Sequence, residues 1–150
     1  MSRLAQIGIA AVVALAALPA TAQDADNPIV KRQNVMKSVG AAAGVGGGML
    51  RKQIPYDANV GALVLATFSA SGHVFGDYFP EDSKQGNKTE AAPAIWEDRA
   101  GFDAELAKYR DAAKAAFESK PADLEAFQKA FVSVAQSCKS CHTSYRVSIN

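Results

Sequence analysis

Residues 124–146 read LEAFQKAFVSVAQSCKSCHTSYR, and this stretch decides which fold the chain can adopt. Apolar and thiol side chains recur along it in steps of three and four: Leu124, Phe127, Phe131, Val134, Cys138, Cys141 and Tyr145. That spacing keeps them on one face of an α-helix. A seam of this kind is typical of helices that cross in a left-handed bundle. The stretch therefore predicts the last helix of a helical bundle.

The same stretch holds Cys138, Cys141 and His142 in the spacing CXXCH, the pattern that attaches c-type haem. On a helix, residues three and four apart share a face, so both thiols and the imidazole point the same way. The two sulfurs can then bond the two vinyl groups of one haem while His142 reaches the iron. The chain has two cysteines in all, so we expect one covalent haem c.

Three other interpretations compete with haem attachment. A thioredoxin-like dithiol would follow a strand in an alternating pattern of strands and helices, which the sequence lacks. A zinc site would need a further Cys or His at short spacing, and His73 is the only other histidine. A disulfide in an exported protein would leave His142 without a role. Haem attachment accounts for all three motif residues.

The first 22 residues have the features of a secretory signal peptide. Arg3 supplies a positive charge, residues 7–18 form an apolar run, and Ala20 and Ala22 make a small-x-small cleavage site. The run is shorter than the ~20 residues that span a bilayer. We therefore expect cleavage after Ala22, no membrane span thereafter, and one domain over residues 23–150. Export would place a bacterial chain in the periplasm.

Charge narrows the range of functions. Without the signal, 15 basic and 15 acidic residues remain, so the mature chain is formally neutral. A neutral chain does not indicate binding to nucleic acid or to an anionic membrane. The sequence also lacks a strand pattern, paired catalytic carboxylates, a Ser/His/Asp set and a phosphate-binding glycine loop. We expect an all-α protein that is not an enzyme.

Helical periodicity marks two earlier helices. Asn27 and Pro28 are suited to open the first one, whose predicted inward stripe is Ile29, Gln33, Met36, Gly40, Ala43, Gly47 and Leu50. Asp57 opens a second helix ending near Phe79-Pro80, with a stripe of Val60, Leu63, Val64, Thr67, Phe68, Ser71, Val74, Phe75 and Tyr78. Glycines at 40, 44, 46, 47 and 48 indicate either a break after Gly44 or close approach of another helix or of the flat cofactor.

Residues 80–93 are polar and lack periodicity, so they predict a loop. Trp96 follows as a core filler or as a residue packed on the cofactor. A third helix comes next, with Phe102, Leu106, Tyr109, Ala113 and Phe117 at helical spacing. The whole pattern predicts an antiparallel up-and-down four-helix bundle, with haem in the bundle core near the C-terminal helix.

Four helices with CXXCH at the end of the last one resemble the class II c-type cytochromes, the cytochrome c prime family. The resemblance covers nearly all of the mature chain, through Arg32-Gln33 with Met36, Phe79-Pro80, Ile95-Trp96, and Cys138 to His142 followed by Tyr145-Arg146. It implies that His142 is the proximal axial ligand. Arg146 would lie beside His142, where a cation could lower the basicity of the imidazole or meet a haem carboxylate.

The resemblance also suggests contacts on the other side of the cofactor. Arg32 would lie near the haem propionates, and Gln33 and Trp96 are further candidates for cofactor contact. The family divides at the position of Met36. Low-spin members use a first-helix methionine as the sixth ligand, whereas high-spin members leave the iron five-coordinate under an apolar side chain, sometimes even a methionine. The resemblance favours Met36 as the sixth ligand, with a flexible core filler as the alternative.

Two functions follow from the resemblance. One is a periplasmic electron carrier that serves redox partner proteins, with His142 and Met36 on the iron. The other is a high-spin protein that binds nitric oxide or carbon monoxide at an open distal site. A haem peroxidase would need an acid or base near the iron, and the first-helix stripe offers only Arg32 and Gln33 as polar candidates. Homodimers through the first two helices are common in the family, and both helices here carry extra apolar surface.

Overall fold

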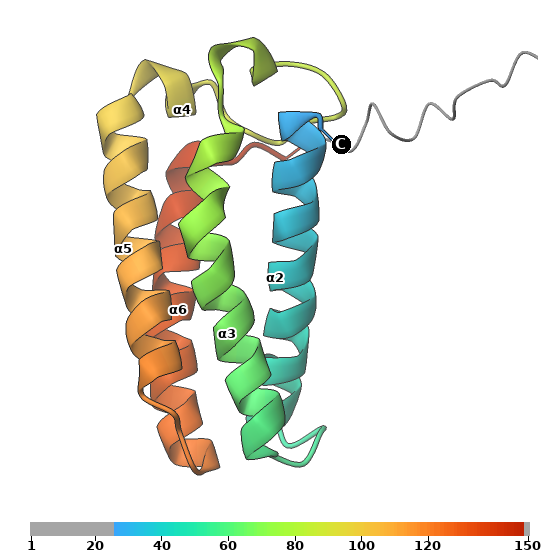
Figure 1. Cartoon of the computed structure of the whole chain (residues 1–150), viewed down its shortest axis with the longest axis vertical. Helices are drawn as coiled ribbons and strands as arrows, with labels where there is room; N and C mark the ends of the chain where they lie inside the picture. Colours follow the sequence, from blue (N-terminus) through green and yellow to red (C-terminus); the bar gives the residue numbers. More distant parts are fainter. Residues whose placement is uncertain (1–25, 149–150) are drawn as a thin grey trace, which may run out of the picture.

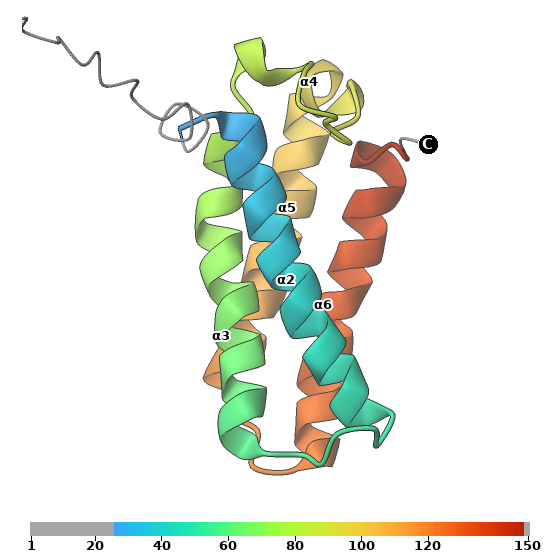
Figure 2. The same ribbon diagram turned by 90° about the vertical axis from the view of Figure 1, so that its right-hand side faces the viewer.

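Four long helices run up and down alongside one another (Figures 1 and 2). The computed structural model describes residues 26–148, so the predicted signal peptide lies outside the described residues. The long helices are α2 (Pro28–Leu50), α3 (Ala58–Val74), α5 (Arg99–Glu118) and α6 (Leu124–Tyr145). The predicted all-α four-helix bundle is confirmed.

The connection from α3 to α5 caps the end of the bundle where α6 finishes (Figure 1). It contains the short helices η1 (Phe75–Tyr78), η2 (Glu81–Ser83) and α4 (Ala94–Glu97). Within residues 26–148 the β-structure amounts to one isolated bridge, between Ala91 and Arg146. That bridge ties the predicted loop to the residue that follows α6.

Side-chain caps fix where the long helices begin. Asn27 Oδ1 accepts a hydrogen bond from the Ile29 amide at 2.8 Å, and Pro28 occupies the first turn. Asp57 caps α3 in the same way. Asp98 and Asp123, which the sequence did not single out, cap α5 and α6. Each side chain satisfies amide groups that a helix start would otherwise leave without partners.

The buried side chains form two clusters. The larger follows the length of the bundle and consists of Val39, Met49, Val64, Leu65, Phe68, Tyr109, Ala113, Ala116, Phe127, Ala130 and Val134. The smaller lies at the α4 end and consists of Phe79, Ile95, Phe102 and Tyr145. Cys138 packs against the larger cluster and Cys141 against the smaller one. The CXXCH motif therefore lies where the two clusters meet.

The predicted inward faces of α2 and α3 are partly wrong. Gly40 and Leu63 were assigned to inward stripes but are exposed, Leu63 at 67%. The buried residues of α2 are instead Ile29, Arg32, Val39, Gly46, Gly48 and Met49, and those of α3 are Gly61, Val64, Leu65, Phe68, Ser71 and Gly72. Both helices carry small or apolar residues around most of their circumference. Periodicity therefore constrains their rotation only weakly.

The glycine-rich part of α2 is helical throughout, so of the two alternatives the break after Gly44 is excluded. Close approach of another helix explains one of the glycines, Gly46. A Cβ added at Gly46 would lie 2.8 Å from Phe131 Cδ2 of α6. Figure 2 shows α2 slanting across the bundle toward α6 at this end and away from it at the opposite end. A Cβ added at Gly40 or Gly44 would meet nothing within 4 Å.

One stretch, Ala58–Tyr78, is long and apolar enough to cross a membrane by length and composition alone. Bundle helices can pass the same test. This stretch comprises α3 and η1, and its side chains Val64, Leu65 and Phe68 are buried in the larger cluster. The expectation of no membrane span after the signal remains a prediction.

Gly46→Ala should destabilise the protein, because its Cβ would overlap the Phe131 ring and overpacking costs about 1–3 kcal/mol. Gly44→Ala is the matched control on the same helix. Its Cβ would meet no other side chain, and exchanging Gly for Ala in a helix stabilises by about 1 kcal/mol. Urea unfolding followed by circular dichroism measures both free energies. Stabilisation by both substitutions would contradict the close approach of α2 and α6.

Candidate haem-attachment site

The CXXCH motif occupies the last two turns of α6. Cys138 and Cys141 are free thiols and both are half-buried. Burial raises the pKa of Cys138, and burial together with the charges of Glu105 and Cys138 raises the pKa of Cys141 to about 11. Both thiols are therefore protonated at neutral pH. A reactive redox dithiol needs a lowered thiol pKa, so these surroundings do not favour the thioredoxin-like interpretation.

His142 is the residue of the motif that could bind a metal through nitrogen. His142 is exposed on α6. Partial loss of hydration lowers its pKa first and the nearby Arg146 lowers it further, while Glu90 acts in the opposite direction. A lowered pKa keeps the imidazole neutral at pH 7, with a lone pair free for iron. Within residues 26–148 no group of three His, Cys, Asp or Glu side chains could hold a metal ion. The zinc interpretation therefore gains no support.

The chain directly after the motif is anchored to the loop and to the start of α5. Tyr145 donates its hydroxyl to Asp98 Oδ2 at 2.9 Å, and its carbonyl accepts from the Ala92 amide at 3.1 Å. The Arg146 guanidinium pairs with Glu90 at 2.6 Å. Arg146 lies near enough to His142 to lower its pKa, and Glu90 partly compensates the charge of Arg146.

A second anchor joins the motif to α5. Ser140, between the two cysteines, donates its hydroxyl to Glu105 Oε2, and Lys108 donates to Glu105 Oε1 at 2.5 Å. Glu105 was not anticipated from the sequence. No sequence signal marks it, because an acidic residue on an amphipathic helix looks like any other solvated charge.

Arg32 is a buried cation at the same end of the bundle, 4% exposed. Its guanidinium donates to the Tyr78 carbonyl at 2.9 Å and to the side-chain oxygens of Ser83 and Thr89, each at 2.8 Å. It also donates to the Ser83 carbonyl at 2.7 Å and lies 4.9 Å from the centre of the Phe79 ring. Burial lowers its pKa.

The partners of Arg32 are neutral. In the part of the chain that the structure describes, no carboxylate forms an ion pair with it. Buried charges in proteins are normally paired. An anionic group that reached this end of the bundle, such as a haem propionate, would supply the missing negative charge.

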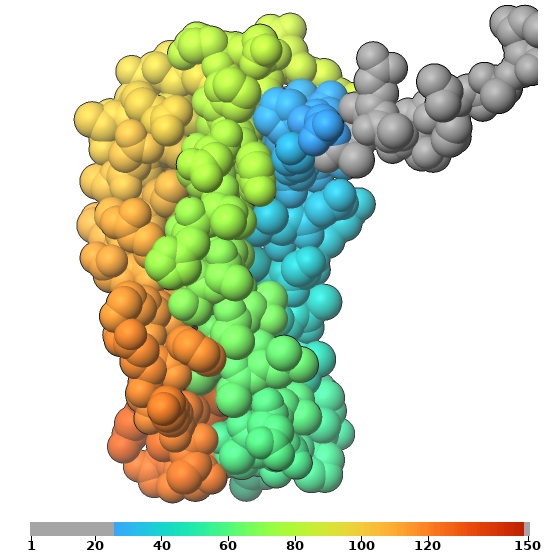
Figure 3. Space-filling view, viewed as in Figure 1, coloured from blue at the N-terminus to red at the C-terminus, as the bar shows by residue number. Residues whose placement is uncertain are grey.

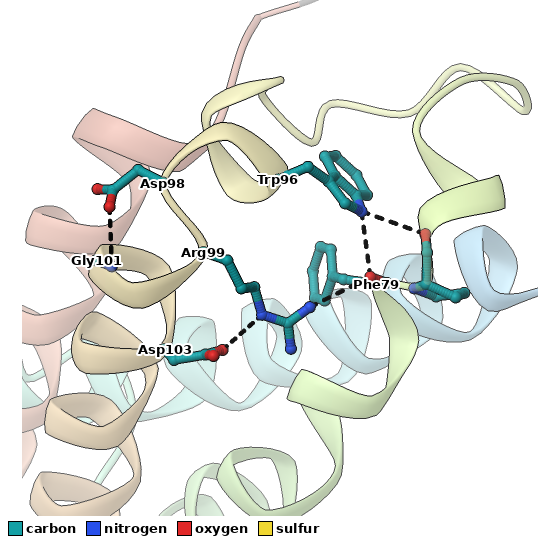
Figure 4. A network of polar contacts seen from close by, with 7 residues as sticks. Phe79, Trp96, Asp98, Arg99, Gly101 and Asp103 are labelled. Atoms are coloured by element: carbon teal, nitrogen blue, oxygen red, sulfur yellow. Dashed lines mark hydrogen bonds and ion pairs between the residues drawn. The ribbon is translucent and has the colours of Figure 1, made fainter.

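Trp96 is fixed over the loop rather than simply filling space. Its indole N–H donates to the carbonyls of Phe79 and Pro80, both at 3.2 Å (Figure 4). Arg99 reaches the same Phe79 carbonyl at 3.5 Å while pairing with Asp103 at 2.9 Å (Figure 4). The indole packs against the smaller cluster, which Cys141 also contacts.

The two remaining candidates on α2 lie in different surroundings. Gln33 donates its side-chain amide to the Asn87 carbonyl at 2.9 Å, so it holds the loop. Met36 is half-buried and packs against the larger cluster, as Cys138 does. Met36 and Cys138 thus pack against the larger cluster, and Trp96 and Cys141 against the smaller one. The loop residues Ser83, Thr89 and Glu90, which hold Arg32 and Arg146, were not anticipated from the sequence.

Comparison with known proteins identifies the family. The sequence model described as Cytochrome C' matches residues 27–146. The chain belongs to this family. It is 34% identical to cytochrome c-556 of Agrobacterium tumefaciens (strain II Chrys), over 79% of its own length and 96% of that protein. It is 35% identical to cytochrome c' of Rhodopseudomonas palustris, over 92% of each chain.

The fold agrees with solved members of the cytochrome c' family. A structure of cytochrome c' from Rhodopseudomonas palustris superposes with a TM-score of 0.77 at 33% identity, covering 83% of this chain and 98% of that one. Like its relatives, this protein is a haem c cytochrome. The donor set fits one such group, since it offers two half-buried free thiols, a neutral imidazole and a buried cation that has no carboxylate partner within residues 26–148.

Arg32→Lys should destabilise the loop, because a lysine keeps the charge but cannot reach Ser83 and Thr89 together as the guanidinium does. We expect a loss of about 2–4 kcal/mol in the free energy of unfolding. Arg99→Lys is the control, since that half-exposed side chain pairs with Asp103 near the surface and should cost about 0.5 kcal/mol or less. Denaturant unfolding measures both. Equal costs would show that the loop does not depend on Arg32.

Proposed function

We propose that this protein is an electron carrier of the cytochrome c' family. Cys138 and Cys141 attach the haem, His142 is the proximal ligand and Met36 is the sixth ligand. Bound haem c supplies a one-electron couple between Fe(III) and Fe(II). The observation that carries the proposal is that Cys138 of the CXXCH motif on α6 and Met36 on α2 pack against the same buried cluster.

The surroundings of each ligand support this role. The pKa of His142 is lowered, so its imidazole is neutral and needs no proton loss before binding iron. Met36 is unbranched and half-buried, and its thioether is a ligand that raises a reduction potential and closes the site to gases. The two side chains come from different helices, which permits axial binding from opposite sides.

Other side chains would orient the cofactor rather than react. Arg32 and Arg146 are cations that could meet haem carboxylates, and Arg32 is the one without an anionic partner in the described chain. Trp96 and Gln33 would add contacts from the loop end of the bundle. Arg32 and Gln33 both donate to loop oxygens, so neither is free as an acid or base. This supports a carrier without catalytic activity.

Gas binding is the second candidate. The observation that favours it is that Gly40 and Gly44, which follow Met36 along α2, lack side chains and have open space beside them. Glycines weaken a helix, so Met36 could be held loosely enough to leave the iron five-coordinate. A distal side of that kind would admit nitric oxide or carbon monoxide.

We also propose that the protein works in the periplasm with redox partner proteins. The signal-like residues 1–22 and the covalent haem both fit an exported bacterial carrier. The formally neutral mature chain gives no reason to expect nucleic acid as a partner.

Met36→Leu should convert a low-spin spectrum into a high-spin one and abolish the methionine-to-iron charge-transfer band, because the isosteric side chain lacks sulfur. Met49→Leu makes the same exchange at a buried core methionine of the same helix and should leave the spectrum unchanged. Absorption spectra of the purified holoproteins in both redox states measure the effect. A wild-type protein that is high-spin in both states and binds carbon monoxide readily would exclude Met36 ligation and favour gas binding.

The same preparation checks attachment. After denaturation and extraction with acidified solvent, the haem should stay with the wild-type chain, because two thioether bonds hold it. Haem that leaves the chain would refute attachment through Cys138 and Cys141.

We propose that α3 forms the contact of a homodimer. The helix has no acidic residue, lysine or arginine, and its exposed side chains include Val60, Leu63 and Val74. Leu63, Ala70 and Val74 advance by seven and four, so they share one face. Figure 3 shows α3 as a continuous band between α2 and α5 on one side of the molecule. Apolar surface of this kind is typical of an interface.

Leu63→Glu should therefore yield a monomer, since a charge would be placed in the middle of the contact. Val132→Glu makes the same kind of change at an exposed valine of α6 and should leave the assembly unchanged. Sedimentation equilibrium of the holoproteins measures the mass. A monomeric wild type, or a Leu63→Glu variant that remains dimeric, would contradict the contact.

A further inference from the structure

The carboxylate of Glu105 lies against the haem-attachment motif from the neighbouring helix α5. Its Oε2 accepts the hydroxyl of Ser140, the residue directly before Cys141. Its Oε1 accepts from Lys108 Nζ at 2.5 Å. Each oxygen has its own donor, so two side chains fix the position of the charge.

The two charges of this cluster differ in burial. The Glu105 side chain is 16% exposed, whereas that of Lys108 is 67% exposed. A charge away from water is screened less than one in solvent and acts over a longer distance. Lys108 therefore offsets only part of the field of Glu105. The hydrogen bonds from Lys108 and Ser140 lower the pKa of Glu105, which keeps the carboxylate ionised at neutral pH.

Two other carboxylates, those of Glu90 and Asp98, lie beside the residues that follow the motif. Arg146 and Glu90 neutralise one another at 2.6 Å. Asp98 caps the N-terminus of α5, where the helix dipole is positive. Of these carboxylates, Glu105 is the one that is bound to a residue between the two cysteines, through the Ser140 hydroxyl.

We propose that the charge of Glu105 lowers the reduction potential of the haem. Ser140 is the positioning residue, because its hydroxyl holds the carboxylate against the motif. A fixed negative charge stabilises Fe(III) relative to Fe(II), because Fe(III) is the more positive state. Ser140 ties this charge to the peptide segment that carries both attachment points. The inference rests on the proposed function in one respect, which is haem attachment at Cys138 and Cys141.

Glu105→Gln keeps the shape of the side chain and removes its charge, so it should raise the reduction potential of the holoprotein. We expect a roughly threefold to tenfold change in the redox equilibrium constant, tenfold being about 59 mV for one electron. Ser140→Ala frees the carboxylate to move toward solvent and should cause a smaller rise. Lys108→Gln removes the compensating cation and should lower the potential. Redox titration followed by absorption measures all of these.

The matched control is Glu118→Gln, which removes a carboxylate from the same helix where it pairs with Lys114 and is 58% exposed. Its potential should equal that of the wild type. An unchanged or lower potential in Glu105→Gln, with haem still attached, overturns the inference. The inference is also overturned if Glu105→Gln and Ser140→Ala lower the thermal stability but leave the reduction potential unchanged. That result would mean that the contact between Glu105 and Ser140 is purely structural.

The proposed function can fail separately from this inference. If the wild-type spectrum shows no methionine ligation while Glu105→Gln still raises the reduction potential, Met36 is not the sixth ligand and the proposed role of Glu105 stands. If the haem can be extracted from the denatured chain, attachment is wrong and both fail.

Discussion

A buried guanidinium organises the end of the bundle where the CXXCH motif lies. Arg32 comes from the first turns of α2 and donates to the carbonyls of Tyr78 and Ser83 and to the hydroxyl of Thr89. These acceptors hold the connection between α3 and α4 against α2. Taking a charge out of water is costly unless other groups replace the lost hydration. Here neutral dipoles and the Phe79 and Trp96 rings surround the cation, and the described chain contributes no anion.

This arrangement has a consequence for the cofactor. Hydrogen bonds satisfy the donors of Arg32, but they leave its net charge uncompensated. A haem carboxylate could provide the compensation, so binding the cofactor and stabilising the loop would reinforce one another. The loop also carries Phe79 and leads to Trp96, which pack around the smaller cluster beside Cys141. The folding of this end and the shape of the site are thus coupled through one side chain.

The motif itself is held from two directions. Glu105 holds Ser140 from α5, and the loop holds Tyr145 and Arg146 through Ala92 and Glu90. His142 lies between these anchors. Ligands held by neighbouring contacts need less ordering when they bind a metal, so both anchors favour a fixed orientation of the imidazole. At the other end of the bundle, Gly46 lets α2 meet α6 closely.

Local signals in the sequence predicted the elements and the chemistry of the attachment motif. Asn27 and Asp57 marked helix starts, and the steps of three and four from Leu124 to Tyr145 identified the inner face of α6. In the structure α6 runs over Leu124–Tyr145, the span of that periodicity. The CXXCH spacing and the end-of-chain position indicated haem c and the family that the comparisons support. These signals suffice because each depends on residues within a few turns of one another.

The tertiary structure decided the rotation of the helices and the partners of the charges. Leu63 and Gly40 were placed inside from their spacing, but helices with small or apolar residues on most sides have no strong preferred face. Arg32 finds Ser83 and Thr89, and Glu105 finds Ser140, across segments far apart in the sequence. Such pairs depend on how whole helices pack. Periodicity within one helix carries no information about which residue of another helix it will meet.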